Sequence, residues 1–97
     1  MTRWIALFTD GPEMMGVRRE REPAHLAYLR QHGEHIRIGG GLREQPGGPF
    51  VGGLWVIEAD TREQAVALIE NDPYYVPAWR SYRLLVWGKA LPGDVIL

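Results

Sequence analysis

Cysteine is absent from the 97 residues. Its absence excludes disulfide frameworks, thiol nucleophiles and metal sites that use cysteine ligands. Long hydrophobic runs are absent too, since no apolar stretch approaches the ~20 residues that cross a bilayer. We therefore expect no membrane partner. A metal site would have to rest on histidines and carboxylates alone, and the spacing of the three histidines matches no zinc signature, so no metal is predicted.

An excess of charge of either sign is also lacking. The net charge is -1, and no long basic run is present. The arginines at 18, 19 and 21 alternate with glutamates at 20 and 22, a pattern that predicts a solvated segment. Nucleic acid is therefore not an expected partner.

The remaining composition is that of an ordinary globular protein, with 45% apolar and 24% charged residues. The length predicts a single domain over residues 1–97, with a core at 3–88 and a tail at 89–97. The early apolar run is soon broken by Asp10-Gly11-Pro12, which does not fit a signal peptide. We therefore expect a cytoplasmic protein.

Alternating apolar positions, turn residues and capping residues divide the chain into six elements. The expected strands are Arg3–Thr9, 35–42, 54–59 and 79–88, and the expected helices are 22–33 and 60–72. A polar connector is expected to precede the first helix, with Pro23 in its first turn. The second helix carries a capping signature in either Thr61 with Gln64 or Asp60 with Glu63.

This β-α-β-β-α-β order predicts an α+β, ferredoxin-like fold, in which a four-stranded antiparallel sheet has both helices on one face. Right-handed crossovers place the first and third strands in the middle. Their sequences agree, because both are apolar on both faces. In the second strand, Ile36 and Ile38 are expected to face one way and Arg37 the other.

The helices can cover only one face of such a sheet. An uncovered face with these apolar residues would be a large patch, which is rare on a soluble monomer. We therefore predict a homodimer packed sheet to sheet, with Val95-Ile96-Leu97 of the tail reaching across to the partner.

His25 stands out among the histidines. In the first turn of its predicted helix, the positive end of the helix dipole would hold the imidazole neutral, and a neutral imidazole can accept a proton. A half-buried structural histidine is the alternative. His32 and His35 are expected to be exposed surface residues.

Asp72 lies in Asn71-Asp72-Pro73, where the second helix is predicted to end. Ending the helix would be sufficient by itself to explain an aspartate at this position. However, a carboxylate at a helix C-terminus faces the negative end of the dipole, a cost that a bond to a histidine would offset. If the two helices run antiparallel, His25 and Asp72 can meet.

The glycines at 39–41, 47–48 and 52–53 form no nucleotide-binding fingerprint. They are expected to allow close backbone approach or to shape a loop over a pocket. Tyr28, Tyr74 and Trp79 are candidates for the pocket walls.

Three segments resemble the YciI-like (YCII-related) family: "REPAHLAYLRQHG", "GGGL" and "GGLWVIEADTREQAVALIENDPYY". The resemblance covers about residues 3–88. It implies a dimeric α+β barrel in which His25 and Asp72 form an acid/base pair beside a pocket. The sequence departs from the family pattern at Gly40-Gly41-Leu42 and in the aromatic "YYVPAW" after Asp72.

The leading interpretation is a cofactor-independent enzyme of lyase or isomerase type, acting on a small aromatic or lactone substrate. His25 would be the general base and then the acid, and Asp72 would orient it. The expected substrate-binding residues are Tyr28, Gly41, Pro73, Tyr74 and Trp79. The alternatives are a non-catalytic ligand-binding or interaction domain, in which the pair is a structural tie, and a cofactor-free oxygenase.

Overall fold

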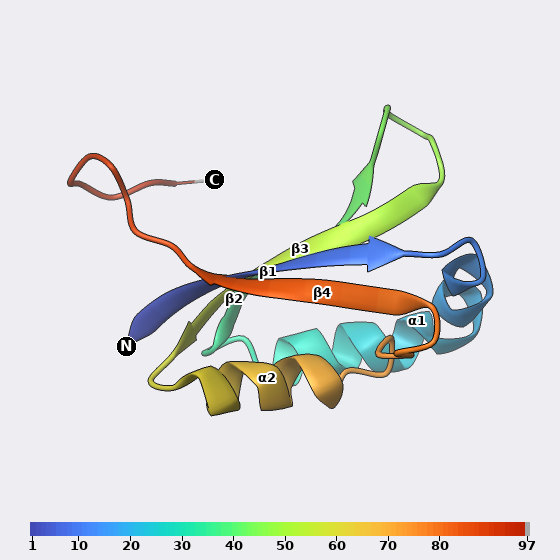
Figure 1. The fold of residues 1–97 in the computed structure, drawn as a ribbon, viewed down its shortest axis with the longest axis horizontal. Coiled ribbons are helices and arrows are strands. Elements are labelled where there is room, and N and C mark those ends of the chain that lie inside the picture. The colour runs from blue at the N-terminus through green and yellow to red at the C-terminus, as the bar shows by residue number, and fades with distance from the viewer. Residues whose placement is uncertain (97) are drawn as a thin grey trace.

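The computed structural model describes residues 1–96, and Leu97, with its expected role in the tail, lies outside the described residues. Six elements follow one another along the chain. They are β1 (Thr2–Asp10), α1 (Met14–Gln31), β2 (Ile36–Arg43), β3 (Phe50–Ala59), α2 (Arg62–Glu70) and β4 (Arg80–Val86). The strands form one antiparallel sheet in the order β2-β3-β1-β4, which confirms the predicted ferredoxin-like arrangement. Both helices lie against one face of the sheet (Figure 1).

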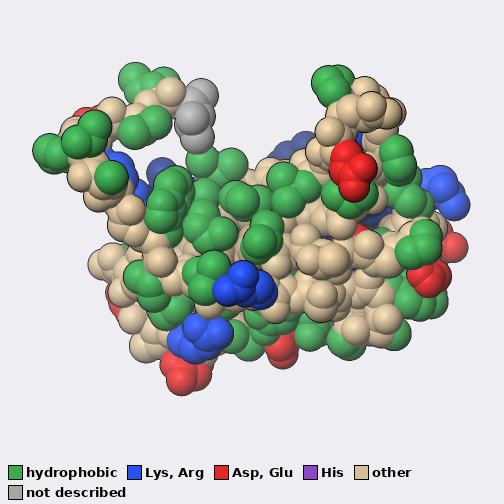
Figure 2. All heavy atoms as spheres, turned by 45° about the horizontal axis from the view of Figure 1, so that its top comes forward, with side chains coloured by type: hydrophobic (Ala, Val, Ile, Leu, Met, Phe, Trp, Pro, Cys, Tyr) green, Lys and Arg blue, Asp and Glu red, His purple; other side chains and the backbone are tan. Residues whose placement is uncertain are grey.

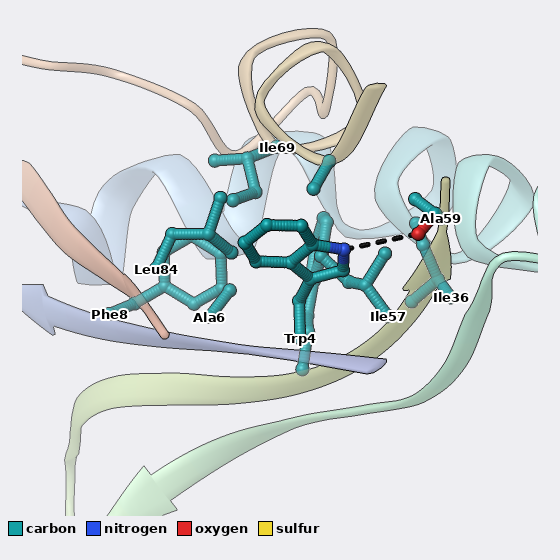
Figure 3. Close-up of a cluster of buried hydrophobic side chains, with 10 residues drawn as sticks. Trp4, Ala6, Phe8, Ile36, Ile57, Ala59, Ile69 and Leu84 are labelled. Atoms are coloured by element: carbon teal, nitrogen blue, oxygen red, sulfur yellow. Dashed lines mark hydrogen bonds between the residues drawn. The ribbon is translucent and has the colours of Figure 1, made fainter. Parts of the chain in front are cut away.

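The core lies between the sheet and the helices. Alternate residues of β1, Trp4, Ala6 and Phe8, point into it and are buried. They meet the alternate residues of β3 and the buried face of α2, where Ile69 is fully buried. The indole of Trp4 also donates a hydrogen bond from Nε1 to the carbonyl oxygen of Ala59, at 3.2 Å (Figure 3). This bond satisfies a polar group that burial would otherwise leave unpaired.

The largest difference from the sequence prediction is the start of α1. The expected polar connector is helical, so that α1 begins at Met14 and Pro23 lies in its interior. Met14 and Val17 are buried against Tyr74, and this packing offsets the hydrogen bond that Pro23 cannot make. The first part of α1 runs at an angle to its second part in Figure 1, as expected of a helix with an internal proline.

β2 also differs from the prediction, because a bulge lies between Ile36 and Ile38. Ile36 pairs with Ile57 and is buried under the helices, whereas Ile38 pairs with Val56 and faces the opposite side. The extra residue of a bulge shifts the alternation by one position. The expectation that both isoleucines face one way was therefore wrong.

β3 begins at Phe50, four residues earlier than expected, so the expected loop is shorter. Gly52 pairs with Thr9 of β1 at such close range that a Cβ at Gly52 would overlap the carbonyl oxygen of Phe8. Glycine lets the two backbones approach here. The glycines thus extend the strand rather than interrupt it.

α2 begins with a capping box between Thr61 and Gln64, one of the two predicted pairs. The backbone N–H of Gln64 donates to the Thr61 hydroxyl, and the side-chain oxygen of Gln64 accepts from the backbone N–H of Thr61. Asn71 caps the other end. Asp72 therefore lies just beyond the helix, as expected.

The face of the sheet opposite the helices carries apolar residues from all four strands, although β4 also presents Arg83 there, paired with Leu7. We call it the open face, and it includes Ile5, Leu7, Ile38, Leu54, Val56 and Leu85. The β2–β3 hairpin and the tail both rise on this side (Figure 1). Figure 2 shows apolar side chains gathered between these two projections. No helix within residues 1–96 is long and apolar enough to cross a membrane.

Candidate functional site

His25 and Asp72 meet between the helices. The Nδ1 atom of His25 lies 2.6 Å from Oδ1 of Asp72, and both side chains are buried. His25 lies inside α1, two residues after Pro23, and not in its first turn. The sequence argument from the helix dipole therefore does not apply. Asp72, and not the helix end, is what orients the ring.

The contact with Asp72 determines which nitrogen of His25 is free. A carboxylate accepts hydrogen bonds, so Nδ1 carries the hydrogen and Nε2 keeps a lone pair that can take a proton. Tyr74 stacks on the imidazole, with ring centroids 3.7 Å apart and planes 7° from parallel. Burial raises the pKa of Tyr74, and the positive charge of Arg18 opposes this shift. Tyr74 is therefore a neutral phenol, and its ring holds the His25 imidazole flat against it.

Asp72 has a second charged neighbour, Arg80 of β4. Nη1 of Arg80 lies 3.9 Å from Oδ2 of Asp72. The same guanidinium donates from Nε and Nη2 to the two oxygens of Asp10, at 2.7 and 3.0 Å. A chain of opposite charges thus runs from the end of β1 through β4 to His25. Such a chain fixes the position of the Asp72 carboxylate.

Arg18 of α1 completes this group. Its Nη2 donates to Oδ2 of Asp10 at 3.2 Å and to the carbonyl oxygen of Gly52 at 3.0 Å. Its guanidinium lies 4.1 Å from the centre of the Phe50 ring, at the base of the β2–β3 hairpin. The prediction of a solvated arginine was wrong at this position, because the first part of α1 packs on the sheet.

We call Asp10, Arg18, His25, Asp72 and Arg80 the charged cluster. Its members differ in access to solvent. The side chains of Asp10, Asp72 and Arg80 are 0%, 1% and 2% exposed, whereas Arg18 and His25 each keep 11% of their side-chain surface exposed. Three members are therefore enclosed. The two that reach solvent are His25, which is the candidate base, and Arg18, which is a cation.

The predicted pocket residue Tyr28 bridges the two helices. Its hydroxyl donates to the carbonyl oxygen of Leu68 at 2.7 Å, and burial, followed by the charge of Asp72, raises the pKa of Tyr28. It lines a cleft of about 420 Å³ together with His32 and His35, and His25 is not among the lining residues. Tyr28 thus approaches Asp72 without sharing a cleft with His25.

His32 and His35 are half-buried, which corrects the expectation of exposed surface residues. The ring of His32 lies 4.4 Å from that of Tyr28. Nδ1 of His35 donates to the carbonyl oxygen of Glu58, 2.8 Å away. Both histidines therefore have packing roles that follow from the turn between α1 and β2.

The other predicted site residues have different surroundings. Gly41 lies beside Phe50 and Arg18, since a Cβ there would overlap the Phe50 ring and come within 3.4 Å of Nη1 of Arg18. The carbonyl oxygen of Pro73 accepts a hydrogen bond from Arg21. The side chain of Trp79 is exposed, and its backbone carbonyl accepts a hydrogen bond from Gly11. No contact between Trp79 and His25 is seen among the described residues.

Sequence reasoning missed Asp10, Arg18 and Arg80. Asp10 and Arg80 pair with each other although they are 70 residues apart in the sequence. The sequence feature that came nearest to indicating this cluster was Asp10, an aspartate at the end of a buried strand. Within residues 1–96, no group of three or more histidines and carboxylates is placed to hold a metal ion.

Comparison with known proteins places these residues in a family. A similar fold is seen in 5-chloro-2-hydroxyhydroquinone dehydrochlorinase from Burkholderia phenoliruptrix AC1100, solved in complex with 2,5-dihydroxybenzoquinone. The TM-score is 0.76 and the identity 24%, over 89% of this chain and 93% of that one. A search among curated proteins finds no significant match. The family model of the YCII-related domain matches residues 2–88, and the chain therefore belongs to the YCII-related family.

Proposed function

We propose that the protein is a small-molecule enzyme that uses cofactor-independent acid–base chemistry of the lyase or isomerase type. The observation that carries this proposal is the 2.6 Å contact between Nδ1 of His25 and Oδ1 of Asp72. It leaves Nε2 free to take a proton from a substrate and to return it later. Asp72 orients the ring and stabilises the imidazolium that forms.

Family membership supports this reading, and the dehydrochlorinase suggests a substrate class. The name of that enzyme describes loss of hydrogen chloride from a chlorinated hydroxyquinol. Such an elimination needs a base to take a proton while the chloride ion leaves. A single histidine oriented by a carboxylate is sufficient for this step, and no electrons are gained or lost. Hydroxylated aromatic compounds are therefore the first substrates to test, followed by lactones.

The test compares His25→Asn with wild type. The asparagine amide nitrogen replaces Nδ1, so the bond to Asp72 is kept while Nε2 is removed. The assays measure chloride release from 5-chloro-2-hydroxyhydroquinone, and solvent deuterium uptake by hydroxylated aromatics and lactones. Loss of general base catalysis should lower the rate by about 100-fold or more. Asp72→Asn should also lower it, and His32→Asn serves as a control with unchanged rate.

Unchanged turnover in the His25→Asn variant would contradict the catalytic role. A non-catalytic binding domain is the second candidate, because His25 is only 11% exposed and is absent from the lining of the cleft beside Tyr28. In that case the pair is a structural tie. His25→Ala would then destabilise the fold strongly, and wild type would turn over none of the compounds that it binds.

We also propose that the protein is a homodimer packed through the open face. Ile38 and Leu85 on this face are each 43% exposed. A large contiguous apolar patch is rarely left uncovered on a monomer. The hairpin and the tail stand on either side of the face (Figure 2) and would border the partner.

Light scattering at micromolar concentration tests the dimer. Wild type should show twice the mass of one chain, and Leu85→Glu should be monomeric because it would bury a charge in the interface. Leu26→Glu is the matched control, since Leu26 is 38% exposed on α1 and away from the open face. A monomeric wild type would refute the proposal.

A further inference from the structure

We propose that Arg18 is an anion-recognition group for the ligand of the His25 site. The substrate class is then a small planar compound with an acidic oxygen, such as a phenolate, an enolate or a vinylogous carboxylate. This proposal rests on the proposed function and names the part of the ligand that His25 does not touch. It follows from the hydrogen bonds, the charge balance and the placement of Arg18.

The hydrogen bonds of Arg18 leave part of its guanidinium unpaired. Both of its hydrogen bonds come from Nη2, and within residues 1–96 its Nε is the buried side-chain nitrogen or oxygen that has no partner. A buried donor without a partner costs free energy, so native proteins rarely keep one. Nε itself is enclosed by the protein, so a ligand acceptor would bind instead to Nη1, which makes neither of these bonds and is not enclosed.

Asp10 cannot supply that acceptor. Arg80 already occupies both of its oxygens, with Nε on Oδ1 and Nη2 on Oδ2. Arg18 receives one longer contact, 3.2 Å to Oδ2. The geometry therefore makes Arg80 the structural partner of Asp10 and leaves Arg18 incompletely compensated.

The charge balance of the cluster changes during the proposed reaction. Two guanidinium groups face two carboxylates, so the cluster is neutral while His25 is neutral. Once His25 has taken a proton, one positive charge is in excess. Excess charge in a largely buried site is unfavourable, and a negative charge on the ligand would compensate for it.

The placement of the two exposed members suits one ligand. Arg18 and His25 are seven residues apart on α1 and lie on either side of Pro23. Both lie beside Tyr74, with the Arg18 Cζ atom 5.3 Å and the His25 ring 3.7 Å from the centre of its ring. A ring with polar substituents at opposite ends can reach both.

The chemistry is balanced. A proton passes from the substrate to Nε2 of His25, and the electron pair it leaves is delocalised onto the substrate oxygen beside Arg18. The guanidinium then stabilises the charge that develops on this oxygen. No oxidant or reductant is required.

Calorimetric binding tests this with two probes that differ in charge. One is 2,5-dihydroxy-1,4-benzoquinone, which ionises as a vinylogous acid, and the other is its neutral dimethyl ether. Wild type should prefer the anion by about 10-fold or more, the value of one charge-assisted hydrogen bond. Arg18→Gln should abolish this preference, and Arg21→Gln, a change at an exposed arginine, should keep it.

Arg18→Lys keeps the charge and loses Nε, so it provides a second variant if Arg18→Gln does not fold. It should lose most of the preference, because lysine lacks the planar donor set. The proposal is overturned if wild type fails to bind the anion, if both probes bind equally, or if the preference survives in the arginine-18 variants. His25→Asn should still bind the anion, and this separates the proposal from the catalytic role of His25.

Discussion

Asp10 should be the most sensitive carboxylate of the fold. Its side chain is fully buried and accepts two hydrogen bonds from Arg80 and one from Arg18. Asp10→Asn keeps the shape and removes the charge. Arg80 would then keep Asp72, 3.9 Å away, as a counter-ion, and Arg18 would lose its ion pair with a carboxylate of the charged cluster.

The size of the effect follows from this arrangement. Removing one partner of a buried ion pair costs about 3–5 kcal/mol. The asparagine oxygen can still accept one bond, so we expect a loss near the lower end, about 3 kcal/mol. With a urea slope of about 1.5 kcal/mol/M for a domain of this size, the unfolding midpoint should fall by about 2 M.

Urea unfolding followed by tryptophan fluorescence measures this loss, because Trp4 and Trp55 are buried. Wild type and variant must be compared at one protein concentration, since dimerisation would shift the midpoint. Asp94→Asn, at an exposed position in the tail, should have no effect. A loss below about 1 kcal/mol for Asp10→Asn would refute the reasoning that this carboxylate holds two buried arginines.

Two further predictions concern the sheet. Gly52→Ala would drive a methyl group into the Phe8 carbonyl oxygen and should cost about 3 kcal/mol or more, whereas Gly40→Ala, with nothing within 4 Å of its Cβ position, should be tolerated. Equal thermal stability of the two variants would contradict this. Burial, helped by the bond to Glu70, raises the pKa of Tyr82 to about 12. Tyr82 therefore stabilises the fold fully below pH 10, and this contribution is lost as the pH rises toward about 12. Ultraviolet titration of the phenolate should show a lower midpoint in Glu70→Gln, and an unchanged midpoint would refute the role of Glu70.

Much of the fold was predictable because it depends on local rules. Residues that are apolar on both faces identified β1 and β3 as central strands, and the capping signature, with Thr61–Gln64 as one of its two possible pairs, marked the start of α2. The chirality of crossovers then left one topology. Of the site, the sequence indicated that His25 and Asp72 can meet if the helices are antiparallel, and the family resemblance implied that they form a pair. The argument that the helix dipole holds His25 neutral does not apply, since His25 lies inside α1 and not at its N-terminus.

The sequence by itself determined the element order, the two-sided apolar strands and the helix end at Asn71-Asp72-Pro73. These features follow from neighbours a few positions apart. Tertiary structure decided how far α1 extends, because Met14 is buried only when Tyr74 packs on it. It also decided that Arg18 joins the charged cluster through its bond to Asp10. Burial and ion pairing depend on groups that are distant in sequence, as Asp10 and Arg80 are, and no local pattern records them.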